Sequence, residues 1–313
     1  MENSVTSSAS RGPARPDRHA SHTSYTSYVA VGDSFTEGMC DDLLPNGRYR
    51  GWADRVAARL AAEQPAGAAI RYANLAVRGK LIGQIHDEQI GEAAALRGDL
   101  VTLAGGLNDV LRPGCDVDRV EELLGRSATA LLDSGATVVL FTSTDPTRRL
   151  AGSARLLPAI MRMKAFVEGV AAHPRVAVVD LFSAPCFDDR RLWAEDRLHL
   201  SPEGHRRVAE AVLEALGRPA AFDWRAPLPA AAPRGRVEKL RSDVRWLGAH
   251  LGPWIGRRLT GRSSGDGRTG AHYDAALGRI VPTTITWLGM PAPAEAPWPQ
   301  EPPHGAAAPV DGR

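Results

Sequence analysis

Short apolar runs alternate with longer amphipathic segments along the chain from residue 27 onward. The apolar runs are rich in Val, Leu and Ile, which is typical of buried strands. They cover residues 27–32, 70–76, 99–106, 136–143 and 175–181. Elsewhere apolar residues recur at helical spacing, as Leu124, Ala128 and Leu131 do. We predict helices over residues 51–64, 82–96, 116–135, 153–173 and 201–217.

This alternation determines the expected fold class. Strands that are apolar nearly throughout belong to a parallel sheet covered by helices on both faces. We therefore predict an α/β fold over residues 27–217, a three-layer α/β/α sandwich around a five-stranded parallel, flavodoxin-like sheet. In open sheets of this kind, ligands bind beyond the carboxyl ends of the strands. The chemistry is therefore expected at the strand tips.

The two ends of the chain have a different composition. Residues 1–26 are rich in Ser, Thr, Arg and Pro and contain no apolar run of the kind a signal peptide needs. We expect a disordered leader there and a disordered Pro-rich tail over residues 290–313. Residues 218–289 remain as a C-terminal extension, in which residues 226–235 are typical of a linker and 283–289 of a short extended piece.

The extension contains one amphipathic segment, residues 236–259. Its apolar positions lie at helical spacing opposite a largely basic face, and they are Val237, Leu240, Val244, Leu247 and Leu251. We predict that this basic helix packs on the core of the protein. Peripheral contact with a membrane surface, or with a partner protein, is the alternative.

Composition and charge narrow the classes of function. A chain of 313 residues, 43% hydrophobic and 24% charged, can bury a sizeable core. Its net charge of +2 gives no electrostatic reason to expect a nucleic-acid partner. No apolar stretch approaches the roughly 18 residues that a transmembrane segment needs.

The cysteines and the absence of nucleotide motifs bear on cofactors and compartment. Cys40, Cys115 and Cys186 are odd in number and lack C-x-x-C spacing, so they indicate neither a disulfide framework nor a zinc site. A reducing compartment is consistent with this, and we predict a cytoplasmic location. Because no P-loop or G-x-G-x-x-G motif follows a strand, we expect no cofactor, and we predict no metal.

Polar residues follow four of the predicted strand tips or their loops, and they should meet at one rim of the sheet. They are Asp33 and Ser34, Gly79, Asn108 and Asp109, and Asp196 and His199. Ser34 becomes a nucleophile if His199 takes its proton. Asp196, three residues before His199, can reach the imidazole across one turn and fix its tautomer.

Acyl transfer also requires donors for an oxyanion. The backbone N–H groups of Ser34 and Gly79 and the side-chain amide of Asn108 can supply them. Glycine at position 79 permits a close approach of the backbone to a substrate.

Four sequence blocks together resemble the signature of the SGNH, or GDSL-type, hydrolases. They are Gly32-Asp33-Ser34-Phe35, Gly79 after Asn74-Leu75-Ala76, Gly106-Leu107-Asn108-Asp109, and Asp196-Arg197-Leu198-His199. The resemblance covers about residues 27–217. It implies an esterase or lipase that cleaves carboxylic esters of small molecules or lipids through an acyl-enzyme, without a cofactor. It also implies a triad of Ser34, Asp196 and His199, with Ser34, Gly79 and Asn108 forming the oxyanion hole.

Two departures and several alternatives qualify the resemblance. Phe35 stands where the family often has leucine, and Arg78 and Lys80 flank Gly79, so substrates with negative charge near the ester should be tested. The alternatives are an O-deacetylase of carbohydrates or small metabolites, or a non-catalytic binding or scaffold module. Ser34 with Asp33 can also be read as a plain turn cap. Because all four blocks occur in order, we favour the enzyme over these alternatives. We expect Asp33 to stabilise the turn rather than to transfer a proton.

Overall fold

The computed structural model describes residues 23–44, 47–66, 68–150, 152–230, 235–251, 267–268, 273–274, 279–280 and 283–286. The predicted Pro-rich tail and nearly all of the predicted leader lie outside these residues. Where the chain is described, no helix is long and apolar enough to cross a membrane.

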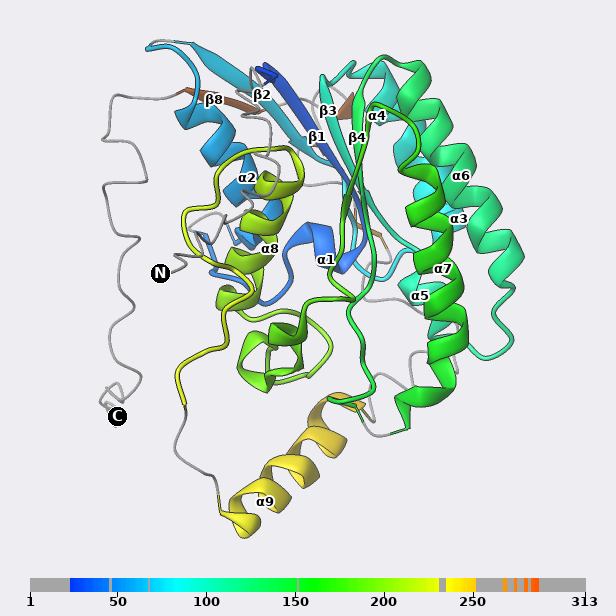
Figure 1. Ribbon diagram of the computed structural model, residues 1–313, viewed down its shortest axis with the longest axis vertical. Coiled ribbons are helices and arrows are strands. Elements are labelled where there is room, and N and C mark those ends of the chain that lie inside the picture. The colour runs from blue at the N-terminus through cyan, green and yellow to red at the C-terminus, as the bar shows by residue number, and fades with distance from the viewer. Residues whose placement is uncertain are drawn as a thin grey trace, which may run out of the picture.

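A parallel sheet of five strands runs through the centre of the molecule (Figure 1). The strands are β1 (Ser27–Gly32), β2 (Ala69–Asn74), β3 (Leu100–Ala104), β4 (Thr137–Phe141) and β5 (Val176–Val179). Their order is β2-β1-β3-β4-β5, which is the flavodoxin-like order, and all neighbouring strands in this order pair in parallel. The predicted fold class is thus confirmed.

A sixth strand, β8 (Thr283–Thr286), pairs antiparallel with β2 at the edge of this sheet. It lies within the segment that we expected to be extended. A separate pair, β6 (Tyr273–Asp274) and β7 (Arg279–Ile280), forms a short antiparallel ribbon. The C-terminal extension therefore adds a strand to the sheet.

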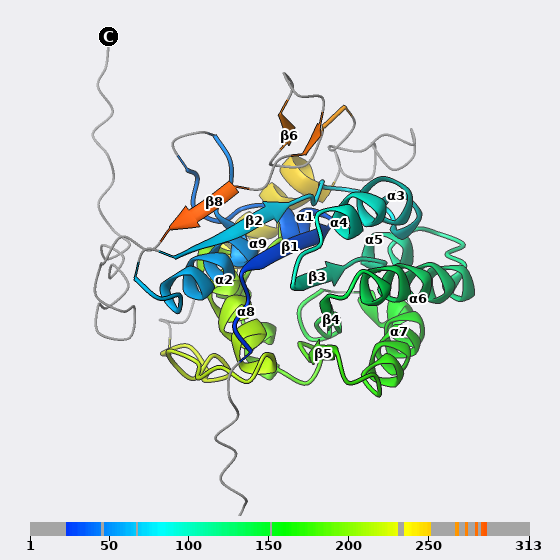
Figure 2. The same cartoon turned by 90° about the horizontal axis from the view of Figure 1, so that it is seen from above.

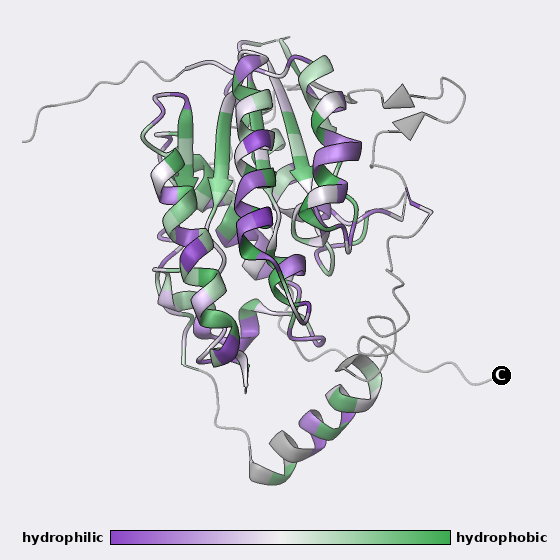
Figure 3. Cartoon of the chain, turned by 90° about the vertical axis from the view of Figure 1, so that its right-hand side faces the viewer, coloured by the Kyte–Doolittle hydropathy of each residue, from purple (hydrophilic) through white to green (hydrophobic). Residues whose placement is uncertain are grey.

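Helices cover both faces of the sheet (Figure 2). On one face lie α2 (Gly51–Ala62) and α8 (Pro202–Ala215). The other face carries α3 (Ile82–Ile85), the π-helical turn η1 (His86–Ile90), α4 (Gly91–Ala95), α6 (Val117–Asp133) and α7 (Leu157–Val170). Strands are mostly hydrophobic, whereas helices alternate between hydrophobic and hydrophilic positions (Figure 3).

Each face has its own hydrophobic core, and β1 contributes to both. Tyr28 and Ala30 pack on the side of α2 and α8, whereas Val29 and Val31 pack on the side of α3 and α6. Successive side chains of a strand point to opposite faces, so an apolar residue is required at every position. This accounts for the continuous apolar runs in the sequence.

Short helical turns complete the carboxyl rim of the sheet. They are α1 (Ser34–Glu37), α5 (Leu107–Val110), η2 (Ser153–Leu156), η3 (Pro185–Asp188) and η4 (Arg190–Leu192).

The packed body continues past residue 217, where the composition changes. Trp224 is 2% exposed, and its indole N–H donates to Glu214 at 3.0 Å. The guanidinium of Arg207 donates to the carbonyl oxygens of Trp224 and Ala226. Residues 218–226 are thus fixed on α8.

The basic helix of the extension forms as α9 (Arg236–Trp246) and the π-helical turn η5 (Leu247–Leu251), while residues 252–259 lie outside the described chain. Of the five predicted apolar positions, the side chains of three are described, and these three are exposed. Val237 and Val244 are 64% and 61% exposed, and Leu247 is 49% exposed. Contact is made instead by polar groups of Asp243 and Trp246.

Candidate active site

Ser34 stands directly where β1 ends and α1 begins. Gly32 has a φ of +152°, and a Cβ added there would lie 2.5 Å from the carbonyl oxygen of Ala104 and 2.6 Å from the hydroxyl of Thr36. Only glycine fits this exit from the sheet. Asp33 caps the turn, its carboxylate accepting the N–H of Phe35 at 3.0 Å. The half-buried Ser34 is thereby held at the strand tip.

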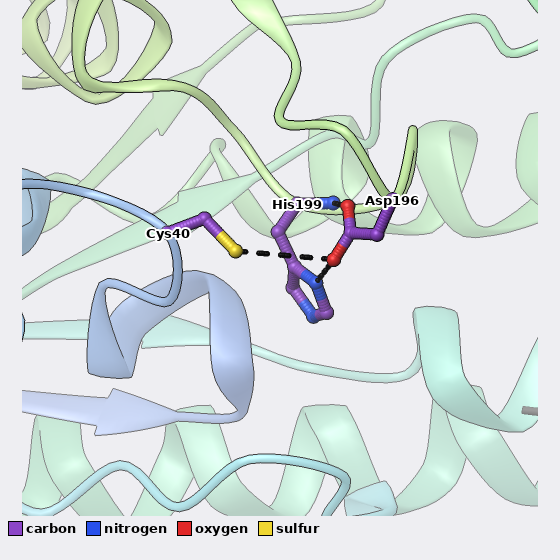
Figure 4. Close-up of side chains that lie close together, drawn as sticks. All are labelled: Cys40, Asp196 and His199. Carbon is purple, nitrogen blue, oxygen red and sulfur yellow. Dashed lines mark hydrogen bonds and ion pairs between the residues drawn. The ribbon is translucent and has the colours of Figure 1, made fainter. Parts of the chain in front are cut away.

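Ser34, His199 and Asp196 form one chain of hydrogen bonds. Ser34 Oγ and His199 Nε2 are 3.0 Å apart, and His199 Nδ1 lies 2.6 Å from Asp196 Oδ2. The other carboxylate oxygen of Asp196 accepts the backbone N–H groups of Leu198 and His199, both at 3.0 Å. Figure 4 shows Asp196 and His199 facing each other. Tertiary structure thus brings together three residues that lie up to 165 positions apart.

The charges of this pair are mutually stabilised. Burial acts to lower the pKa of His199, but its hydrogen bond to Asp196 and the charge of that carboxylate outweigh burial and raise the pKa. Burial acts to raise the pKa of Asp196, but the hydrogen bonds and charge of His199 hold it below its usual value. Asp196 is therefore a carboxylate at neutral pH, as a partner for an imidazolium must be.

Asn108 lies beside this chain of hydrogen bonds. Its side-chain amide donates to Asp33 Oδ2 at 2.9 Å and to the carbonyl oxygen of Lys80 at 3.1 Å. Burial raises the pKa of Asp33 to about 6, although the Phe35 N–H opposes this. Asp33 thus braces the turn, as expected, and in addition orients Asn108, which the sequence did not reveal.

Gly79 has a left-handed φ of +78°. Gly79 does not line the cavity described below. The backbone carbonyl oxygen of its neighbour Lys80 accepts a hydrogen bond from the side-chain amide of Asn108. Asp109 holds this segment as well, since its carboxylate accepts the N–H of Ile82 at 3.0 Å. The turn after β2 and helix α5 are therefore tied together at the rim.

The basic residues beside Gly79 have acidic partners. The Arg78 guanidinium and backbone N–H both bond to the carboxylate of Glu37, and Lys80 pairs with Glu88 at 2.6 Å. These pairs balance the two positive charges. The expectation of substrates with negative charge near the ester loses its support, because it assumed cations available to the ligand.

A cavity of about 130 Å³ opens at Ser34 and His199. Its lining is mainly apolar and includes Phe35, Leu107, Phe141, Met163, Phe187 and Trp193. The segment between α1 and α2 contributes Met39, and the segment after β4 contributes Thr144. Other lining residues come from α1, α5, α7, the end of β3, the segment between β5 and α8, and α8 itself, and no local pattern predicts the directions of their side chains.

Cys40 also lies at the site. Its φ is +70°, and its Sγ is 3.8 Å from Asp196 Oδ2 (Figure 4). Cys40, Asp196 and His199 place potential metal-ligand atoms within 4.8 Å of one another. Two ligands of one tetrahedral zinc ion lie about 3.3 Å apart, given bonds of about 2.0 Å. The 2.6 Å separation of His199 and Asp196 fits a shared proton better than a shared metal.

A hydroxyl, an imidazole and a carboxylate in line at the carboxyl rim of a doubly wound sheet define the class of α/β/α hydrolases. Residues 30–207 match the model of the GDSL-like Lipase/Acylhydrolase family. Since the match covers more than half of the sequence, the chain belongs to this family, and it is a carboxylic ester hydrolase.

Solved structures share the fold. A catalytic mutant of Axe2, an acetylxylan esterase from Geobacillus stearothermophilus, aligns with a TM-score of 0.52 and 20% identity over 64% of this chain and 95% of that chain. The lipase Lip_vut3 from a goat rumen metagenome aligns with a TM-score of 0.50 and 17% identity over 60% and 96%. Among curated proteins, none matches the sequence.

Proposed function

We propose that the protein is a serine esterase that forms and then hydrolyses an acyl-enzyme. The observation that carries this proposal is the line of hydrogen bonds from Ser34 Oγ through His199 to Asp196, at 3.0 and 2.6 Å. His199 Nε2 takes the proton of Ser34 as Oγ attacks the ester carbonyl carbon. The imidazolium then gives that proton to the departing alcohol oxygen. Water, deprotonated by the same nitrogen, releases the carboxylic acid.

Asp196 supports these proton transfers without itself being protonated. Its carboxylate accepts Nδ1–H, which leaves Nε2 as the nitrogen that receives the proton of Ser34. The charge of Asp196 stabilises the imidazolium. The backbone bonds to Leu198 and His199 keep the carboxylate in position.

The oxyanion receives three N–H groups, those of Ser34 and Gly79 and the amide of Asn108. Asn108 donates to Asp33 and Lys80 in the structure, so one of these bonds must be exchanged for the oxyanion. The longer bond, to the Lys80 carbonyl at 3.1 Å, is the one to be exchanged, because Asp33 provides a charged acceptor at 2.9 Å. Asp33 then continues to orient the amide.

The cavity favours an apolar acyl group. A cavity of about 150 Å³ lined by aliphatic and aromatic residues holds a benzene molecule, and the cavity here is about 130 Å³. The polar side chains of the lining include Thr142, Ser143, Thr144 and Lys164, while most of the lining is apolar. By this comparison of volumes, we expect an acyl group of about six carbons to fit the cavity. Lipid esters and a cytoplasmic location stay predictions from the sequence.

A chain-length series separates this proposal from O-deacetylation. We expect kcat/KM for p-nitrophenyl esters to rise from acetate to about hexanoate and to fall beyond the length the cavity accommodates. An optimum at acetate, with a decline at every longer chain, supports the deacetylase instead.

Labelling with a fluorophosphonate probe tests the nucleophile. We expect one covalent label, located on Ser34 by mass spectrometry and absent from Ser34→Ala. Ser143 also lines the cavity, so Ser143→Ala is the matched control and should keep the label. A label that persists in Ser34→Ala refutes the assignment. A wild-type protein that neither reacts with the probe nor hydrolyses any ester supports the binding-module alternative.

A further inference from the structure

The turn that carries Asp196 and His199 contains an unfavourable backbone conformation. Arg197 has a φ of +62°, in the left-handed region that residues with a Cβ rarely adopt. Such conformations persist at functional sites where the surrounding structure holds them in place. What holds Arg197 therefore also fixes the separation of Asp196 and His199.

The main chain of this turn is bound from outside by two donors. The indole N–H of Trp246 donates to the carbonyl oxygen of Asp196 at 2.8 Å. The guanidinium of Arg149 donates to the carbonyl oxygen of Arg197 at 2.6 Å. Both consecutive peptide groups around the left-handed residue are thus anchored by side chains distant in sequence.

The side chain of Arg197 is bound as well. Its guanidinium pairs with Asp243 at 2.5 Å and lies 4.5 Å from the centre of the Trp246 ring. Arg190 is a second cation near Asp243, at 3.8 Å. Trp246 and Asp243 are one helical turn apart on α9, and both therefore contact the guanidinium of Arg197 from the same side.

Helix α9 lies outside residues 30–207, the span that matches the family. In Figure 1 it crosses the lower end of the molecule, toward which the carboxyl ends of the strands point. Val237 and Val244 on this helix are exposed. Its polar contacts are with the Asp196–Arg197 turn and Arg190.

We propose that the C-terminal extension completes the active site, with Trp246 and Asp243 as positioning residues for Asp196 and His199. This proposal rests on the esterase function above. Trp246 fixes the peptide of Asp196, and Asp243 fixes Arg197, so the carboxylate stays 2.6 Å from Nδ1 and Nε2 stays 3.0 Å from Ser34. Release of the turn lengthens both hydrogen bonds. Most of the apolar cavity is formed by other segments, such as those of Phe35, Phe141 and Met163, so binding of the acyl group changes less than the chemical step.

Trp246→Phe is the most informative variant, because phenylalanine keeps an aromatic ring, although a smaller one, near Arg197 and removes the N–H donor. We expect kcat to fall about tenfold, since small displacements of catalytic groups reduce rates strongly. KM should stay within about twofold and the melting temperature within about 2 °C, because the half-buried side chain contributes little to the core. The rate of reaction with the fluorophosphonate, which reports activation of Ser34 alone, should fall by the same factor as kcat.

Asp243→Asn and Asp243→Glu test the second anchor. We expect the asparagine variant to lower kcat several-fold and the glutamate variant to restore part of it, because only glutamate keeps the charge opposite Arg197. Val244→Ala, on the exposed side of the same helix, is the matched control and should behave like the wild type.

The outcomes separate the two proposals. If the wild-type protein reacts with the probe and Trp246→Phe reacts as fast as Val244→Ala, the positioning role is refuted and the esterase stands. A change in KM with kcat unchanged also refutes it, since a positioning role acts on the chemical step. If the wild-type protein does not react at all, the esterase proposal itself fails.

Discussion

Replacement of Asp196 by asparagine is the most discriminating test of the proposed relay. Asp196 Oδ1 accepts two backbone N–H groups, from Leu198 and His199. An asparagine must place its carbonyl oxygen there, because its NH2 group would face two donors. The NH2 group is then directed at His199 Nδ1. That nitrogen becomes an acceptor, and the proton moves to Nε2, where it blocks transfer from Ser34.

The expected loss follows from this geometry. The wrong tautomer and the lost negative charge together reduce kcat about 10³- to 10⁴-fold, as in serine proteases, which corresponds to about 4 to 5.5 kcal/mol of activation free energy. Asp196→Ala should lose less, because water can fill the space and either tautomer of His199 remains accessible. Asparagine, although closer in shape, is therefore expected to be the less active of the two.

The assay is kcat for a p-nitrophenyl ester near pH 8, with melting temperatures to show that both variants fold. Fluorophosphonate reaction rates provide a second measure that does not depend on deacylation. An Asp196→Asn variant within tenfold of the wild type, or more active than Asp196→Ala, would show that Asp196 does not fix the tautomer of His199.

Three further predictions follow from the site and the core. Asp196 raises the pKa of His199 and only the neutral imidazole accepts a proton, so kcat/KM should rise with pH with a midpoint above 6.5; a midpoint at or below that value contradicts the pairing. Gly79→Ala adds a Cβ at a φ of +78°, at a cost of about 1 to 2 kcal/mol. It should lower kcat/KM at least tenfold by displacing an oxyanion donor, and wild-type kinetics would remove Gly79 from the site. Trp224→Ala should destabilise the fold by about 3 to 5 kcal/mol in denaturant titrations, and a loss below about 1 kcal/mol would show that residues 218–226 are not part of the packed body.

Local patterns in the sequence were sufficient to predict the fold and the principal polar groups of the site. β1 occupies residues 27–32, as its apolar run predicted, and Ser201 caps α8 through a bond to the Gly204 N–H. The polar residues that follow different strands could be predicted to lie close together, because the carboxyl ends of parallel strands lie at the same edge of the sheet. Ser34, Asp196 and His199 were predicted in this way to meet, and their side chains are hydrogen-bonded to one another in the structure.

The contacts between distant segments had no comparable signal. The charge of Arg78 suggested a ligand site until its pairing with Glu37 was known. Trp224 lies in residues 218–225, for which the sequence predicted no element of the packed body, yet it is buried against Phe187. In each case the partner is a side chain far away in sequence, and periodicity describes only neighbours within one element.

The sequence by itself thus determined the layers, the strand ends and the polar groups at the rim, because these depend on local periodicity and on the common direction of parallel strands. Only the tertiary structure decided how these groups are held. Asp33 orients Asn108, and Trp246 and Asp243 bind the turn of Asp196 from helix α9, on which Val237 and Val244 are exposed. Such contacts depend on where single side chains lie in space, which no local pattern encodes.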